Sequence, residues 1–128
     1  MSILTHELFI LSILHCIGDF FLQTREMADN KSTSYKWLTI HVLVYSIPFI
    51  AVGLFFFPIK YVLAFVIFNG FMHWCTDSIT SKWTKYFYQK KNTWAFFAVI
   101  GFDQVLHLAQ YVIAYLEVLD KAYEWNLV

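Results

Sequence analysis

Four apolar segments restrict this 128-residue chain to very few folds. They run approximately over residues 3–23, 37–57, 61–81 and 94–115, and no Asp, Glu, Lys or Arg lies between Trp37 and Ile59. Because an α-helix rises 1.5 Å per residue, about 20 residues cross the roughly 30 Å hydrocarbon core of a bilayer. We therefore predict an all-α integral membrane protein in which residues 1–128 form one four-helix transmembrane bundle with antiparallel neighbours.

The composition indicates the same fold class. Hydrophobic residues make up 59% of the chain and charged residues only 14%, and the mean hydropathy is +0.56. Soluble domains usually carry about 25% charged residues, so this chain is poorly suited to water. We expect membrane lipids to be its surroundings and expect no nucleic-acid partner.

The basic residues predict the orientation of the bundle. Seven of the nine Lys and Arg residues lie in the connections after the first and third segments, whereas Lys60 and Lys121 lie on the opposite side. Connections rich in Lys and Arg remain in the cytoplasm. This distribution predicts that both termini lie outside.

Three of the four segments carry a histidine and an aspartate four residues apart. Side chains with this spacing project from the same face of a helix. Ionisable groups inside a membrane are costly, and they usually face the interior of a bundle and have a function. A shared cation would stabilise several of them at once. The pairs are His15 with Asp19, His73 with Asp77, and Asp103 with His107.

The depths of these residues also favour a common site. Counted at 1.5 Å per residue, most of them lie roughly 5–14 Å from the cytoplasmic ends of the segments, and one lies a turn deeper. Imidazole and carboxylate ligands suit zinc, which we expect first, or manganese or iron, and the set is large enough for one or two ions. The predicted metal ligands are His15, Asp19, His41, His73, Asp77, Asp103 and His107.

Other polar side chains in the segments are predicted to orient these ligands. Metal-binding histidines and carboxylates normally hydrogen-bond to neighbouring polar groups, which fix their orientation. The candidates are Gln23, Gln104, Asn69 and Tyr45.

The same residues resemble a known family. The similar residues are the segment from His15 to Gln23, Lys31, the pair His41 and Tyr45, the segment from His73 to Asp77 and the segment from Phe102 to His107. Through them the chain is similar to the bacterial and phage membrane family called domain of unknown function 3307. The resemblance implies a bacterial inner membrane protein. It also implies a lysine about three residues after Asp77, where this chain has Thr80. A distant similarity to proteins labelled membrane-bound metal-dependent hydrolases implies a hydrolytic activity.

Hydrolysis is the first of three functions that the sequence allows. In this hypothesis Asp103 and Asp19 are catalytic, and a metal-activated water attacks a phosphoester of a lipid or lipid-linked molecule. Arg25, Lys31 and Lys82 would bind the anionic headgroup at the cytoplasmic surface.

Two alternatives remain open. The ligands could form a transit site for a divalent cation or for protons, although the outer halves of the segments carry few polar residues. They could also stabilise a structural or interaction module, such as a phage or host-defence membrane factor, through a metal or through His–Asp hydrogen bonds alone. A homodimer would help so small a bundle in each case.

Overall fold

A computed structural model describes residues 3–122, with side chains from residue 6 onward. Within this range the chain is helical and contains no β-strand, which confirms the all-α prediction. The elements are α1 (Ile3–Cys16), the π-helix η1 (Ile17–Phe21), α2 (Arg25–Asn30), α3 (Tyr35–Phe56), α4 (Ile59–Gln89), α5 (Thr93–Ala114) and the π-helix η2 (Tyr115–Asp120).

Three helical stretches are long and apolar enough to cross a membrane: α3, α4, and α5 continued by η2. They overlap the predicted segments 37–57, 61–81 and 94–115. The helix α3 continues through Pro48, as neighbouring helices in a bundle permit. The first predicted segment is divided, because α1 has 14 residues and continues only as the five-residue π-helix η1.

Side-chain caps fix the helix starts at one end of the molecule. The Ser34 hydroxyl accepts a hydrogen bond from the backbone N–H of Trp37, and the Asn92 side chain accepts one from Ala95. Both satisfy N–H groups that the first helical turn leaves unpaired. The short links before α3 and α5 therefore turn the chain back sharply.

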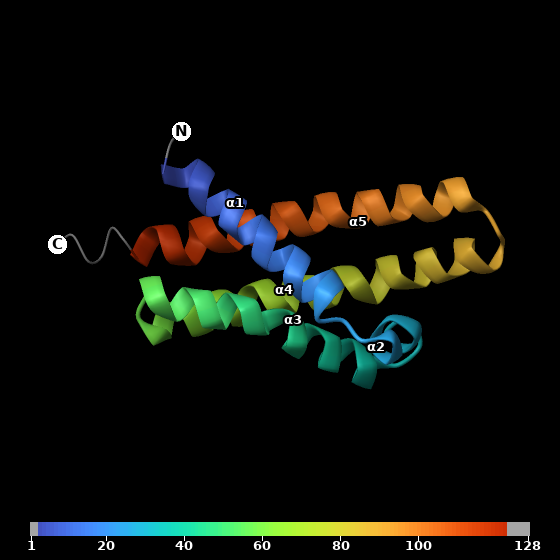
Figure 1. Ribbon diagram of the computed structural model, residues 1–128, viewed down its shortest axis with the longest axis horizontal. Helices are drawn as coiled ribbons and strands as arrows, with labels where there is room; N and C mark the ends of the chain where they lie inside the picture. Colours follow the sequence, from blue (N-terminus) through green and yellow to red (C-terminus); the bar gives the residue numbers. More distant parts are fainter. Residues whose placement is uncertain (1–2, 123–128) are drawn as a thin grey trace.

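The helices α4 and α5 pack against each other along much of their length, and α3 packs on α4. Figure 1 shows α1 crossing this layer, with α2 at the end where α4 and α5 are joined. The beginning of α1, the end of η2 and the turn between α3 and α4 lie at the other end. The chain from α1 to η1 is thus placed beside α3 and α5.

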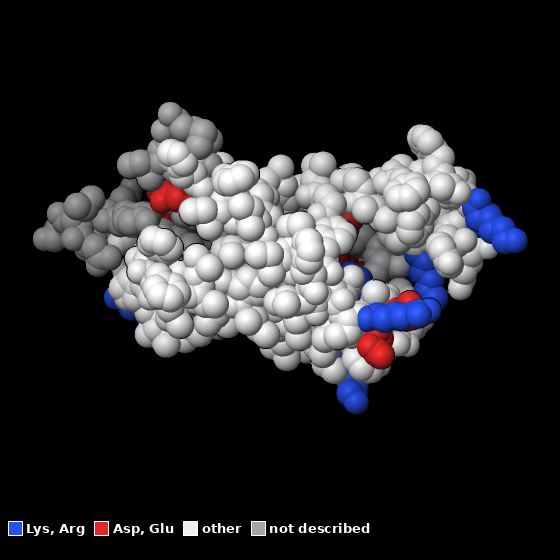
Figure 2. Space-filling view, viewed as in Figure 1, with Lys and Arg blue, Asp and Glu red and all other residues white. Residues whose placement is uncertain are grey.

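The two ends of the bundle have different interiors. An apolar cluster that includes Leu11, Phe49, Phe65 and Tyr115 fills the end near the beginning of α1. The buried histidines and aspartates lie farther toward α2. Outside, large apolar side chains are exposed, including Phe55 at 85%, as expected for a surface that faces lipid. Figure 2 shows most of the Lys and Arg side chains gathered at the α2 end.

Candidate metal centre

The first aspartate of the site lies on a π-helical turn. The backbone N–H of Leu22 donates to the carbonyl of Ile17 at 2.9 Å, five residues back, so η1 is wider than an α-helix. Such turns within helices often occur at functional sites. Gly18 allows η1 to approach α3, since an added Cβ would lie 2.6 Å from the Tyr45 carbonyl oxygen. The neighbouring Asp19 is 4% exposed.

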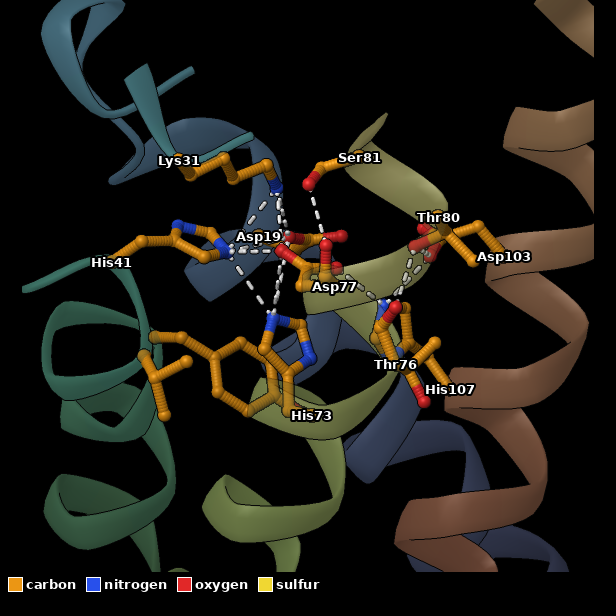
Figure 3. A network of polar contacts seen from close by, with 12 residues as sticks. Asp19, Lys31, His41, His73, Thr76, Asp77, Thr80, Ser81, Asp103 and His107 are labelled. Atoms are coloured by element: carbon orange, nitrogen blue, oxygen red, sulfur yellow. Dashed lines mark hydrogen bonds and ion pairs between the residues drawn. The ribbon is translucent and has the colours of Figure 1, made fainter. Parts of the chain in front are cut away.

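Four side chains from three elements converge on one point. Asp19 comes from η1, His41 from α3, and His73 and Asp77 from α4. One ligand atom from each lies within 4.8 Å of the other three. Both histidines are completely buried. Figure 3 shows these side chains pointing toward one another.

The distances between these atoms are those of a coordination shell. His41 Nε2 lies 3.1 Å from His73 Nε2, 3.2 Å from Asp19 Oδ1 and 3.3 Å from Asp77 Oδ2. His73 Nε2 lies 3.7 Å from each of the two carboxylate oxygens. Tetrahedral zinc with ligands at roughly 2.0–2.1 Å places neighbouring ligand atoms about 3.3–3.4 Å apart. The arrangement therefore fits a transition metal ion.

Asp19 Oδ1 supports the same fit. It is fully buried, and none of its contacts has hydrogen-bond geometry, although His41 Nε2 lies 3.2 Å away. A metal ion between these atoms would satisfy this oxygen more completely. The Nδ1 atoms of His41 and His73 also lack hydrogen-bond partners. The ring of His73 is held instead by stacking on Tyr45, with the ring centres 3.8 Å apart.

Lys31 enters the same point from the link between α2 and α3. Its Nζ donates to Asp77 Oδ2 at 2.7 Å and lies 3.9 Å from Asp19 Oδ1. Burial favours the neutral amine, but these two carboxylates prevail and raise the pKa of Lys31 above its ordinary value. Its ammonium group therefore compensates part of the negative charge at the centre.

A second group of ligand atoms lies beside the first. Asp103 and His107 on α5 have ligand atoms that fall within 4.8 Å of each other and of a carboxylate oxygen of Asp19. His107 Nε2 is 3.3 Å from Asp103 Oδ1 and 3.2 Å from Asp77 Oδ1. All three predicted pairs thus meet in one polar cluster.

Gln104 connects the two groups. Its Nε2 donates to Asp19 Oδ2 at 3.3 Å and to Asp103 Oδ2 at 3.1 Å. Its Oε1 accepts from His15 Nε2 at 3.1 Å. His15 therefore carries its proton on Nε2 and has no lone pair there for a metal. The amide holds the outer oxygens of both aspartates and leaves each Oδ1 facing inward.

The remaining polar residues of the segments differ in their contacts. Tyr45 Oη accepts from Asn69 Nδ2 at 3.1 Å and lies 3.3 Å from His15 Nδ1, which it can serve as donor. The other carboxamide, Gln23, has a buried Oε1 without a hydrogen-bond partner. Asn69 and Tyr45 thus orient His15. The Oε1 atom of Gln23, in contrast, makes no hydrogen bond to any of the three His–Asp pairs.

A cavity of about 620 Å³ adjoins the centre at the α2 end. The carboxylate-bearing residues Asp19, Asp77 and Asp103 line it together with Lys31 and Lys85. Figure 2 shows a hollow at this end of the molecule with both acidic and basic atoms inside it. Water and small polar groups can therefore reach the carboxylates from this side.

The family model described as protein of unknown function, DUF3307, matches residues 8–128. The chain belongs to this family. No curated protein and no solved structure matches the chain. The DUF3307 match covers every residue of the polar cluster.

Three features of this DUF3307 site differ from the arrangement drawn from the sequence. Lys31 lies inside the centre, while Arg25 pairs with Asp29 on the surface at 3.6 Å and Lys82 lies over the Tyr35 ring. Thr80, which stands where the family resemblance implied a lysine, donates to Asp103 Oδ1 at 2.5 Å. Thr80 follows Asp77 by three residues, and this helical spacing could have indicated it as a neighbour of the site.

Proposed function

We propose that this protein is a membrane-embedded metalloenzyme that hydrolyses an anionic phosphoester presented at the cytoplasmic surface of the bacterial inner membrane. The four converging ligand atoms of Asp19, His41, His73 and Asp77 carry the proposal. Zinc is the ion that this set favours, and manganese and iron are also compatible with it.

The proposed topology has four spans. The helix α1 and η1 together contain 19 residues, and about 28 Å of helix is close to the thickness of the hydrocarbon core. They would form the first span, before α3, α4 and α5. The basic residues at the α2 end support an orientation with that end in the cytoplasm and both termini outside.

The cavity beside the centre supports an enzyme rather than a closed structural site. Structural zinc sites are usually enclosed by protein ligands, whereas catalytic sites keep a position open for water or substrate. A bound transition ion would supply Lewis acidity and lower the pKa of a coordinated water molecule. Here Asp19 and Asp103 belong to the polar cluster and also line the cavity, so their carboxylates face the space that a reacting water would occupy.

The charges around the cavity support an anionic substrate. Lys31 and Lys85 both line the cavity. Arg25 and Lys82 lie at the same end of the bundle as the cavity. An ammonium group binds a phosphate oxygen as a point charge. A lipid or lipid-linked phosphoester would place its headgroup in the cavity and its acyl chains in the membrane. A homodimer would bury additional apolar surface.

A transport function is less well supported. A conducting path would need polar groups through the other end of the bundle. That end is filled by the apolar cluster around Leu11, Phe49 and Phe65. The centre is therefore accessible from the α2 end, and the apolar cluster blocks a polar path toward the opposite end of the bundle.

The decisive test is the metal content of detergent-purified protein, measured by mass spectrometry beside His73→Ala and Asp77→Asn. We expect bound metal in the wild type and its loss in both variants. Gly101→Ala serves as the matched control, since a Cβ there meets nothing within 4 Å. Protein that neither retains zinc, manganese or iron nor takes them up contradicts the proposed metal centre.

Activity is then measured on micelles that contain phosphatidic acid, by the release of inorganic phosphate. The metal-containing wild type should release phosphate and the chelator-stripped wild type should not, and Asp103→Asn should reduce the rate at least 100-fold, in the range of one lost catalytic group. A soluble monoester, p-nitrophenyl phosphate, tests whether the activity requires a lipid. A metal-loaded protein inactive on both substrates contradicts hydrolysis while leaving the metal centre intact.

A further inference from the structure

The polar cluster contains two sets of ligand atoms that share Asp19, and Asp77 Oδ1 lies 3.2 Å from His107 Nε2 of the second set. We propose that the centre is dinuclear, with a second divalent ion between Asp103, His107, Asp19 and Asp77. This inference rests on the proposed metal centre and specifies its composition and its substrate class. The first ion would bind among Asp19, His41, His73 and Asp77.

Asp77 is placed as a bridging ligand. Its Oδ2 lies 3.3 Å from His41 Nε2, whereas its Oδ1 lies 3.2 Å from His107 Nε2. The two oxygens of one carboxylate therefore face two different histidine groups. Carboxylates with this arrangement occur between two metal ions about 3.5–4 Å apart. The aspartate is 1% exposed and lines the cavity at the α2 end.

The contacts of His107 place its Nε2 against carboxylate oxygens of Asp77 and Asp103, where it can hold a cation or a proton. Gln110 Nε2 donates to the Thr76 hydroxyl, which turns Gln110 Oε1 toward His107 Nδ1 at 3.0 Å. That oxygen can only accept, so Nδ1 carries a proton. Nε2 faces two carboxylate oxygens, so either a second proton or a metal ion on Nε2 satisfies these contacts. The dinuclear centre requires the metal ion.

Asp19 and Asp103 are held so that each offers one oxygen to the centre. Gln104 engages Oδ2 of both residues. Asp103 Oδ1 accepts from Thr80 at 2.5 Å and retains a lone pair toward His107 Nε2. Gln104 thus orients an aspartate in each set of ligands, and Thr80 orients Asp103 in addition.

The charge of a dinuclear centre defines the substrate class. One divalent ion together with the Lys31 ammonium balances the three carboxylates of Asp19, Asp77 and Asp103. A second ion leaves excess positive charge in a buried site, which is unfavourable unless an anion accompanies it. A phosphate group that carries two negative charges supplies this balance and can bind both ions. We therefore expect phosphate to strengthen the binding of the second ion.

The wild-type protein provides the first test. Metal-free protein in detergent is titrated with Mn²⁺ and followed by electron paramagnetic resonance. The first equivalent should give the signal of an isolated ion, and the second should convert it to that of a magnetically coupled pair. Inorganic phosphate at millimolar concentration should lower the dissociation constant of the second ion at least tenfold, whereas chloride, which carries a single negative charge, should leave it unchanged at the same concentration.

Two variants locate the ions separately. His41→Ala and His107→Ala should each reduce the bound Mn²⁺ from two ions per chain to one and abolish the coupled signal. Gly101→Ala should bind two. The elution volume in size-exclusion chromatography checks that each variant remains folded.

The outcomes separate this inference from the metal centre itself. One ion per chain, lost in His41→Ala and retained in His107→Ala, overturns the dinuclear assignment while the metal centre stands. Two ions without magnetic coupling overturn the carboxylate bridge. Absence of any binding in the folded wild type overturns both.

Discussion

Gln104 acts on the ligands without needing to touch a metal. Its amide fixes Asp19 and Asp103 through their Oδ2 atoms and fixes the tautomer of His15. Loss of such an orienting group typically weakens metal binding 10- to 100-fold. The site therefore depends on a residue that ligand chemistry alone would pass over.

We predict that Gln104→Leu weakens zinc binding by about 10- to 100-fold, because both aspartates lose a donor that holds them in place. Competition with a fluorescent zinc chelator measures the affinity. Gln89→Leu is the matched control, since Gln89 lines the same cavity and is exposed. Equal affinities for the two variants would show that the amide does not orient the ligands.

In the proposed metal centre, Lys31 would compete with the metal ion for the carboxylates of Asp77 and Asp19. Its pKa is raised by Asp77 and Asp19, so the stabilisation from this ion pair is complete below the ordinary value of 10.5 and is lost only as the pH rises through the higher folded value. Without a metal ion, the ammonium therefore remains charged between pH 6 and 9.

We predict that Lys31→Met increases zinc affinity at least tenfold, because a positive charge is removed from the immediate neighbourhood of the ion. Lys85→Met, which changes another lysine of the cavity, should have a smaller effect. Weaker zinc binding in Lys31→Met would mean that the lysine positions the carboxylates instead of competing for them.

At the scale of elements, the contact between η1 and α3 sets the position of the first aspartate. Gly18 lies so close to Tyr45 that a methyl group would require the two elements to separate. Asp19 follows directly in the chain, and Tyr45 stacks on His73. A displacement at this contact therefore reaches ligands on two helices.

We predict that Gly18→Ala lowers the free energy of unfolding by about 1–3 kcal/mol, as overpacking generally does, and reduces metal occupancy. Thermal unfolding in detergent and metal analysis give the two readouts. Gly101→Ala, with open space around its Cβ, should change neither. Wild-type occupancy in Gly18→Ala would show that η1 can shift without moving Asp19 out of place.

The sequence predicts helices more fully than it predicts their junctions. Spacing of four residues correctly indicates that His73 and Asp77 share a face, since the side chains approach to 3.7 Å. Period and hydropathy cannot reveal the π-turn at Ile17–Phe21, because it depends on the packing of Gly18 against α3. The place of Lys31 was also beyond the sequence, since a loop residue is positioned by tertiary contacts, here with Asp77.

At the scale of the whole molecule, the apolar sides and the basic α2 end are the two surfaces that bear on the orientation of the protein in a membrane. The sides of the bundle expose large apolar groups such as Phe55 and Ile67, at 85% and 71%. Basic residues gather at the α2 end (Figure 2). This combination favours a bundle that is surrounded by lipid and has its cavity at the cytoplasmic surface.

We predict that Lys60→Cys reacts with a membrane-impermeant maleimide on intact spheroplasts, whereas Lys90→Cys reacts only after the membrane is permeabilised. The physical reason is that the α3–α4 turn and the α4–α5 turn lie at opposite ends of the bundle (Figure 1). Both variants are made with Cys16 and Cys75 replaced by Ser, because these cysteines are free thiols. The reverse pattern of labelling would invert the proposed topology.

The polar cluster draws its members from nearly the full length of the chain, from Asp19 to His107. During synthesis, the earliest ligand leaves the ribosome long before the latest, and no shorter nascent chain can contain the complete set. The centre must consequently assemble within the bilayer after α5 has been inserted. Acquisition of metal would then mark the end of biogenesis, and a cell could distinguish finished molecules from truncated ones by whether they retain the ion.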